Sequence, residues 1–107
     1  MKYKVTLELY NERQACGHYL REMVTDEYTR AYCEFTTMAN NLDKLMWDLE
    51  KCESRTYMEG LTIIVEINQV EEDEWGDLVH AGDPVFEASL TYKEYKAAKA
   101  AAEEEGE

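Results

Sequence analysis

The sequence predicts an α+β fold. We expect a small antiparallel or mixed sheet of about four strands, with one main helix over residues 38–54 packed on a face and a second helix at the C-terminus. Three observations lead to this: several segments alternate apolar and polar residues, one repeats them every three or four residues, and the end is rich in Ala, Lys and Glu. The 107 residues suit one domain, so we expect a single domain over 1–107.

Alternation with a period of two predicts the strands. Residues 3–10 place four apolar side chains on one face and polar ones on the other, and residues 29–36 and 85–92 alternate in the same way. The stretch 61–70 is rich in Ile and Val and carries apolar residues on both faces. We therefore expect it to be a central strand that is partly covered on both sides.

The segment 12–24 is open between two interpretations. Ala15, Tyr19 and Met23 repeat at four-residue steps, and Asn11 three residues before Gln14 resembles a helix start, so a short helix is plausible. A glycine inside the segment weakens a helix by about 1 kcal/mol relative to alanine. A hairpin strand is the alternative.

A single apolar stripe predicts the main helix, 38–54. It consists of Leu42, Leu45, Met46, Leu49 and Cys52. We expect Thr36 or Thr37 to cap its N-terminus. From Lys93 the composition favours a C-terminal helix, whose acidic end at 103–107 lies at the negative pole of the helix dipole and should fray.

The charge balance limits the classes of partner. The chain holds 24 Asp and Glu against 11 Lys and Arg, a formal net charge of −13. Most non-specific affinity for DNA and RNA comes from basic side chains against phosphates, so direct nucleic-acid binding is not expected. The same repulsion argues against an anionic membrane surface.

We expect a cytoplasmic protein. The N-terminus alternates polar and apolar residues without the apolar run of a secretory signal, and no segment is long enough to span a bilayer. Cys16, Cys33 and Cys52 are an odd number without a compact spacing. This indicates reduced thiols, most of them buried, rather than disulfides.

Motifs for catalysis, metals and cofactors are not found. Zinc sites need four ligands that usually arrive as close pairs, whereas the nearest set here is Cys16 and His18. Nothing orients that pair for nucleophilic catalysis, and the acids of the loop 71–84 do not match a calcium-binding pattern. We therefore expect no enzyme, metal or cofactor. A small enzyme acting through Cys16, His18 or His80 remains the third possibility.

Acidic residues are concentrated in the second half of the chain. Residues 1–58 carry 10 acids and 8 bases, a net of −2, whereas residues 59–107 carry 14 acids and 3 bases, a net of −11. Residues 59–92 hold 9 acids and no base. Such a run is most often a solvated loop, but like charges at this density cost stability, and an aromatic residue inside a charged rim is typical of an interface. The predicted partner-binding residues are Glu66, Glu71, Glu72, Asp73, Glu74, Trp75, Asp77, Asp83 and Glu87.

A small acidic α+β chain with acidic runs at 71–74 and 103–105 resembles the counter-defence proteins of phages and mobile elements. These include anti-CRISPR and anti-restriction inhibitors that mimic nucleic acid. The resemblance is one of size and composition, without an aligned motif. It implies a non-enzymatic protein that docks an acidic surface into the basic nucleic-acid-binding site of a nuclease. The alternative is a homo-oligomeric structural or interaction module of phage or bacterial origin. It would use an apolar surface that includes Trp47 and several tyrosines.

Overall fold

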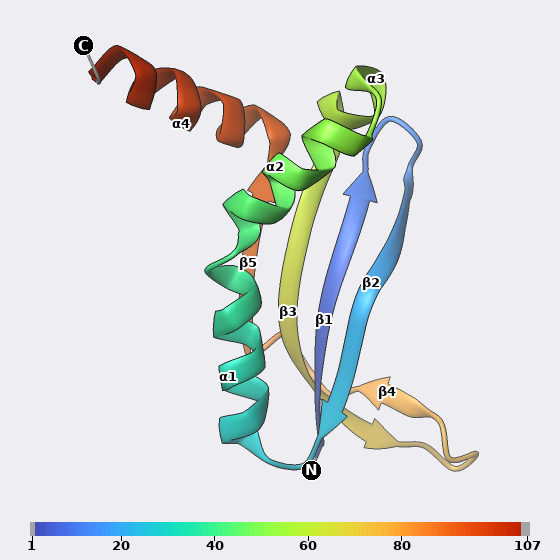
Figure 1. Cartoon of the computed structure of the whole chain (residues 1–107). Coiled ribbons are helices and arrows are strands. Elements are labelled where there is room, and N and C mark those ends of the chain that lie inside the picture. Colours follow the sequence, from blue (N-terminus) through green and yellow to red (C-terminus); the bar gives the residue numbers. More distant parts are fainter. Residues whose placement is uncertain (1, 106–107) are drawn as a thin grey trace.

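The computed structural model describes residues 2–105, with side chains described up to Ala102 (Figure 1). The elements in chain order are β1 (Lys2–Asn11), β2 (Cys16–Thr25), α1 (Tyr28–Ala39), α2 (Leu42–Cys52), α3 (Arg55–Glu59), β3 (Leu61–Glu72), β4 (Leu78–His80), β5 (Phe86–Thr91) and α4 (Tyr92–Glu105). All strand pairs are antiparallel, in the order β2-β1-β3-β4, and β5 also pairs with β3. The predicted α+β class, with a C-terminal helix, is confirmed. The predicted frayed tail over 103–107 lies outside the described residues, apart from the α4 backbone to Glu105.

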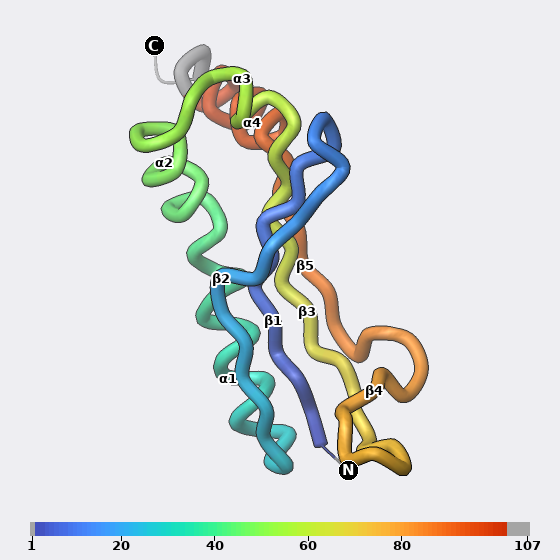
Figure 2. The backbone as a smooth tube through the Cα atoms, turned by 90° about the vertical axis from the view of Figure 1, so that its right-hand side faces the viewer, coloured from blue at the N-terminus to red at the C-terminus, as the bar shows by residue number. Residues whose placement is uncertain are grey.

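The core lies between one face of the sheet and the helices. The register pairs Val5 with Ile67 and Leu9 with Ile63, so the apolar residues of β1 and β3 share one face. Helix α1 packs on β1 and β3, and α2 reaches β5, so both cover that face (Figure 1). The buried cluster consists of Val5, Leu9, Ala31, Phe35, Leu42, Met46, Met58, Leu61, Ile63, Val65, Ile67 and Tyr95. No helix of residues 2–105 covers the opposite face, and Figure 2 views the sheet from that side.

The segment 12–24 forms most of a β-hairpin with β1, so the strand interpretation is confirmed. Asn11, which resembled a helix cap, builds the turn: its Oδ1 accepts from the backbone N–H groups of Arg13 and Gln14, at 3.0 and 3.3 Å. Its Nδ2 donates to the carbonyl of Tyr57 at 2.7 Å. A side chain that satisfies backbone donors serves a turn as well as a helix end, and here the turn prevails.

The prediction of a strand over 29–36 is wrong, because this stretch lies inside α1. Ala31 and Phe35 are the buried residues of that helix, and they stand four residues apart, one helical turn. Cys33 between them suggested a period of two, but Cys33 is exposed. A short run with apolar residues at i, i+2 and i+4 fits either period, and packing against the sheet decides it.

The predicted helix 38–54 is divided at residues 40–41 into the end of α1 and the whole of α2. Thr36 and Thr37 do not cap a helix start, since both lie within α1 and their hydroxyls donate to the carbonyl of Cys33. The stripe itself is real, because Leu42 and Met46 are buried. All three cysteines are exposed, which corrects the expectation of mostly buried thiols.

Replacing Asn11 by alanine should destabilise the fold strongly. The side chain is only 2% exposed, and its loss removes three hydrogen bonds and leaves the Tyr57 carbonyl without its partner. We expect the free energy of unfolding in urea to fall by about 2–3 kcal/mol. The control is Asn41→Ala, which removes one exposed bond, to the Thr37 carbonyl, and should cost less than about 1 kcal/mol. Equal losses in the two variants would contradict the role given to Asn11.

Candidate functional site

Carboxylates gather on the sheet face opposite α1 and α2. The strand register places Glu22 opposite Thr6, Thr6 opposite Glu66, and Glu66 opposite Glu87, which makes one row across β2, β1, β3 and β5. Glu8 stands two residues from Thr6 on the same strand and shares its face. We call Glu8, Glu22, Glu66 and Glu87 the carboxylate face. Like charges directly opposite one another destabilise a sheet, so the pair Glu66 and Glu87 costs stability.

Few cations neutralise the carboxylate face. The Nζ of Lys4 lies 3.9 Å from a carboxylate oxygen of Glu22. Glu66 accepts a hydrogen bond of 3.1 Å from the side-chain amide of Asn68, which carries no charge. Within residues 2–102, Glu8, Glu66 and Glu87 form no ion pair with Lys or Arg. The face therefore presents a net negative charge to its surroundings.

The negative charge of the carboxylate face affects the pKa of Tyr19. Tyr19 of β2 stands opposite Glu8 of β1 in the strand register, and the centre of its ring lies 6.0 Å from the Nζ of Lys4. Burial raises the pKa of the Tyr19 hydroxyl, and the negative charges of Glu8, Glu66 and Glu22 raise this pKa further. Three carboxylates from three strands thus act on one phenol.

The hairpin of β3 and β4 leaves the sheet on the side away from α1 and α2 (Figures 1 and 2). Its turn depends on Asp73, whose Oδ1 accepts from the N–H groups of Trp75 and Asp77, both at 2.9 Å. Gly76 has a φ of 82°, which favours glycine. Trp75 is 85% exposed at this turn. An acidic hairpin with an exposed indole thus stands on the same side of the molecule as the carboxylate face.

The nine predicted partner-binding residues fall into separate groups. Glu66 and Glu87 lie on the carboxylate face, and Asp83 lies in the loop between β4 and β5. The remaining six belong to the β3–β4 hairpin: Glu71, Glu72, Asp73, Glu74, Trp75 and Asp77. The Asp73 carboxylate is engaged by the turn, and Glu72 lies 3.3 Å from the Nζ of Lys2.

Two residues of the carboxylate face were missed by the sequence analysis. Glu22 belongs to the segment 12–24, whose strand or helix character was left open, so no face was assigned to it. The alternation of residues 3–10 does place Glu8 on the face opposite the core, but Glu8 lies outside the acid-rich second half of the chain and stands apart from its acidic runs. Only the pairing of β1 with both neighbours brings the four acids together.

The residues considered for zinc and catalysis lie apart. Cys16 and His18 are exposed on β2, where the Cys16 Sγ lies 3.7 Å from the Gln14 side-chain oxygen. His80 is exposed on β4. The described part of the chain contains no group of three or more His, Cys, Asp and Glu residues that is arranged to hold a metal ion.

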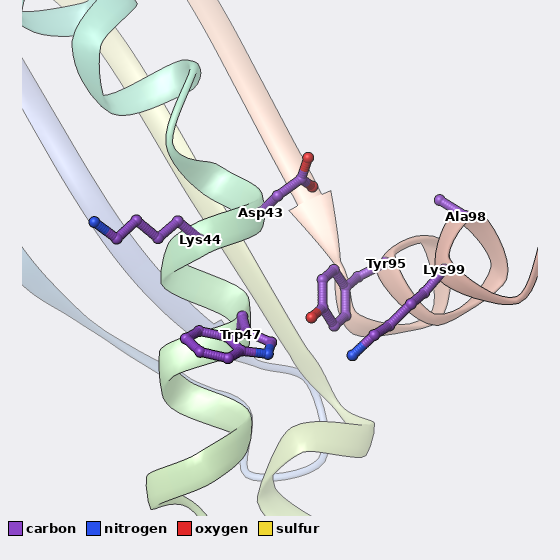
Figure 3. A pocket seen from close by; sticks show the side chains of 6 residues that line it. All are labelled: Asp43, Lys44, Trp47, Tyr95, Ala98 and Lys99. Carbon is purple, nitrogen blue, oxygen red and sulfur yellow. The ribbon is translucent and has the colours of Figure 1, made fainter. Parts of the chain in front are cut away.

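A hollow of about 510 Å³ lies between α2 and α4 (Figure 3). Trp47 and Tyr95 face it from the two helices, and it is also lined by Asp43, Lys44, Ala98 and Lys99. Trp47 is 43% exposed, which confirms that it lies off the buried stripe, and the Nζ of Lys51 stands 3.2 Å from the centre of its ring. An apolar ring is therefore open to the outside at the end of the molecule remote from the β3–β4 hairpin (Figure 1).

Glu50 holds the start of α4 against α2. It accepts a hydrogen bond of 2.6 Å from the Tyr92 hydroxyl, and the Nζ of Lys96 lies 2.9 Å away. The hydrogen bonds from Tyr92 and Lys96, in that order, lower the pKa of the Glu50 carboxyl. The Nζ of Lys99 lies farther away, at 3.9 Å.

Comparisons with known proteins identify no relative. No protein-family model matches the chain, and neither curated sequences nor solved structures give a match. None of the described helices is long and apolar enough to cross a membrane. Charge and geometry are therefore the basis for inferring the function.

Glu50→Gln should destabilise the protein at neutral pH and reduce the acid sensitivity of its stability. Because folding lowers the pKa of Glu50 below its ordinary 4.5, the stabilisation is complete above that value and is lost as pH falls through the folded pKa. Urea unfolding from pH 7 to pH 3 measures this. The difference between wild type and variant should shrink as the pH falls, and a constant difference would exclude Glu50 as the titrating group.

Proposed function

We propose that this chain is a non-enzymatic inhibitor of the anti-CRISPR or anti-restriction kind. It docks its acidic surface into the basic nucleic-acid-binding site of a nuclease. The observation that carries the proposal is that the carboxylate face and the β3–β4 hairpin stand on the same side of the molecule, with Lys2 and Lys4 as their paired cations. A basic groove is the partner that such a surface fits. The proposal needs no catalytic residue, metal or cofactor.

The spacing of the carboxylates supports mimicry of nucleic acid. Neighbouring strands lie about 4.7–4.9 Å apart, and alternate residues of one strand lie about 6.6–6.8 Å apart. Glu66 and Glu87 are neighbours across strands, and Glu22 is two strands from Glu66. Duplex DNA presents a phosphate about every 3.4 Å along the axis of each strand. The two-strand separation of Glu22 and Glu66, about 9.4–9.8 Å, is close to three phosphate steps, whereas the separation of Glu66 and Glu87 falls between one step and two.

Docking would also relieve a cost that the free protein bears. Glu66 and Glu87 repel one another across two strands, and their only described polar contact is the bond that Asn68 donates to Glu66. Arginine or lysine from a partner would form charge-assisted hydrogen bonds with them, which are stronger than neutral ones. Association should accordingly be fast at low salt and should weaken as salt screens the charges.

An assay that measures inhibition of nuclease cleavage tests the proposal. Purified RNA-guided nucleases and restriction endonucleases cleave a labelled duplex with increasing amounts of the protein. At least one enzyme should be inhibited, less so at higher salt. In Glu66→Lys/Glu87→Lys, the concentration for half inhibition should rise by about 100-fold or more, since two charged contacts are lost and each contributes about 1.5–3 kcal/mol.

The matched control is Asp48→Lys/Glu53→Lys, which makes the same change in net charge at exposed positions around α2. It should inhibit nearly as well as the wild type. Equal loss in both double variants would show that overall charge, not the carboxylate face, is responsible. If no enzyme of either class is inhibited at low salt, the proposed function is wrong.

Self-association is the alternative function, and the hollow between α2 and α4 favours it. Trp47 and Ala98 offer an exposed apolar surface beside the buried ring of Tyr95, and a second copy could bury it through a twofold interface. Sedimentation at up to millimolar concentration should then show dimers, and Ala98→Arg should abolish them. Asp48→Lys, on α2 next to Trp47 but outside the lining of the hollow, is the control. A strict monomer at the highest concentration would exclude this alternative.

A further inference from the structure

Four aromatic rings form a continuous series at the end of the molecule where β1 and α1 begin. The ring centres of Tyr3 and Tyr28 are 5.4 Å apart, those of Tyr28 and Tyr32 are 6.2 Å apart, and those of Tyr32 and Phe86 are 5.6 Å apart. We call these four residues the aromatic ladder. Its residues come from β1, α1 and β5, which are distant in the sequence and meet in the folded structure.

The ladder is anchored to the hydrophobic core, and three of its rings remain partly exposed to solvent. Phe86 packs on Phe35 at 5.9 Å between ring centres, and Phe35 belongs to the buried core. Tyr28 and Tyr32 are one helical turn apart on α1, so they project from the same side of that helix. Yet Tyr28, Tyr32 and Phe86 are 41, 43 and 40% exposed. Rings that are fixed but uncovered are prepared for contact with another molecule.

Within the described residues, the ladder differs from four other aromatic rings in having no lysine over its faces. Lysines lie over four rings elsewhere: Lys4 over Tyr19, Lys51 over Trp47, Lys96 over Tyr92 and Lys99 over Tyr95. No Lys or Arg of the described residues occupies such a position over a ring of the ladder. The faces of these rings are therefore not taken up by cations of the same chain.

The charged residues next to the ladder in sequence are mainly acidic. Asp26 and Glu27 directly precede Tyr28, and Asp83 lies in the loop that leads into Phe86. Arg30 is about 200° around α1 from Tyr28, which places it on the far side of the helix. Lys2 of β1 is paired with Glu72 of the β3–β4 hairpin. Accessible ring faces beside carboxylates attract a cation that can also stack.

We propose that the aromatic ladder binds arginine side chains of a basic protein segment. The ladder lies on the helix side of the sheet, because Phe86 stands opposite Ile67, whereas the carboxylate face is on the open side. The inference rests on the proposed function and specifies its partner: besides the segment on the carboxylate face, the partner reaches around the end of the sheet with a segment rich in arginine rather than lysine. A guanidinium group is planar and weakly hydrated, so it stacks on aromatic faces better than an ammonium group does. Alternate residues of an extended segment stand about 6.6–6.8 Å apart, close to the spacing of the rings. Successive arginines could thus meet successive rings.

A fluorescence anisotropy titration with two labelled peptides of equal length and charge tests this. One peptide has arginine at every basic position, and the other has lysine at the same positions. The arginine peptide should bind the wild type more tightly by about 5- to 30-fold, as two exposed cation–π contacts would give. Tyr28→Leu/Tyr32→Leu keeps the apolar bulk but removes the ring faces. It should bring the ratio of the two affinities close to one, with little effect on the lysine peptide.

Trp47→Leu is the matched control, because it removes an aromatic ring of similar exposure whose face is already occupied by Lys51. It should leave the arginine preference unchanged. A wild type without preference, or a preference that survives in Tyr28→Leu/Tyr32→Leu, would overturn the role of the ladder while leaving the acidic docking surface intact. If neither peptide binds at low salt, the ladder is not an arginine site, and the cleavage assay decides the proposed function separately.

Discussion

The register between β1 and β3 determines both the core and the acidic surface. It pairs Val5 with Ile67 on the helix side, and one residue along it pairs Thr6 with Glu66 on the open side. Because side chains alternate along a strand, a slip by one residue would expose the valine and bury the glutamate. The apolar pairs that stabilise the fold therefore also fix the position of the carboxylates. The acidic face cannot move without dismantling the core.

The repulsion between carboxylates lies on the face opposite the hydrophobic core, whose burial offsets its cost in stability. The side of the sheet that faces α1 and α2 supplies the hydrophobic stabilisation, through residues such as Ile63 and Val65, which are fully buried. The open side carries Glu66 opposite Glu87, a pairing that a sheet selected for stability alone would avoid. Asn68 bonds to Glu66 without neutralising it. Unfavourable pairs that persist beside a well-packed core are typical of surfaces with a binding role.

The sequence predicted the parts whose periodicity is unambiguous. Strands over 3–10, 61–70 and 85–92 follow from alternation, and packing in the structure agrees with them. The stretch 29–36 was misassigned because three apolar residues at two-residue steps also fit a helix, and only packing on the sheet decides between the two. Asn11 was misleading for a related reason, since the same side chain caps turns and helices.

The candidate surface was predictable only where acids are adjacent in sequence. The β3–β4 hairpin could be recognised as a charged run, whereas the carboxylate face needs the pairing of strands that are distant in sequence. Glu22 and Glu66 are 44 positions apart and meet through β1. The same holds for the aromatic ladder, whose members Tyr3 and Phe86 come from opposite ends of the chain. Neither grouping leaves a local pattern in the sequence.

The bulge in β2 has a consequence for behaviour in concentrated solution. The register between β1 and β2 shifts so that Leu20 has no partner, in the middle of a ten-residue strand at the edge of the sheet. A long, regular edge would offer its free backbone groups to another copy and would begin the growth of extended sheet aggregates. The additional residue twists the strand and interrupts that row of groups. Irregularity at this one position thus makes the exposed edge a poorer template for pairing with a strand of another copy.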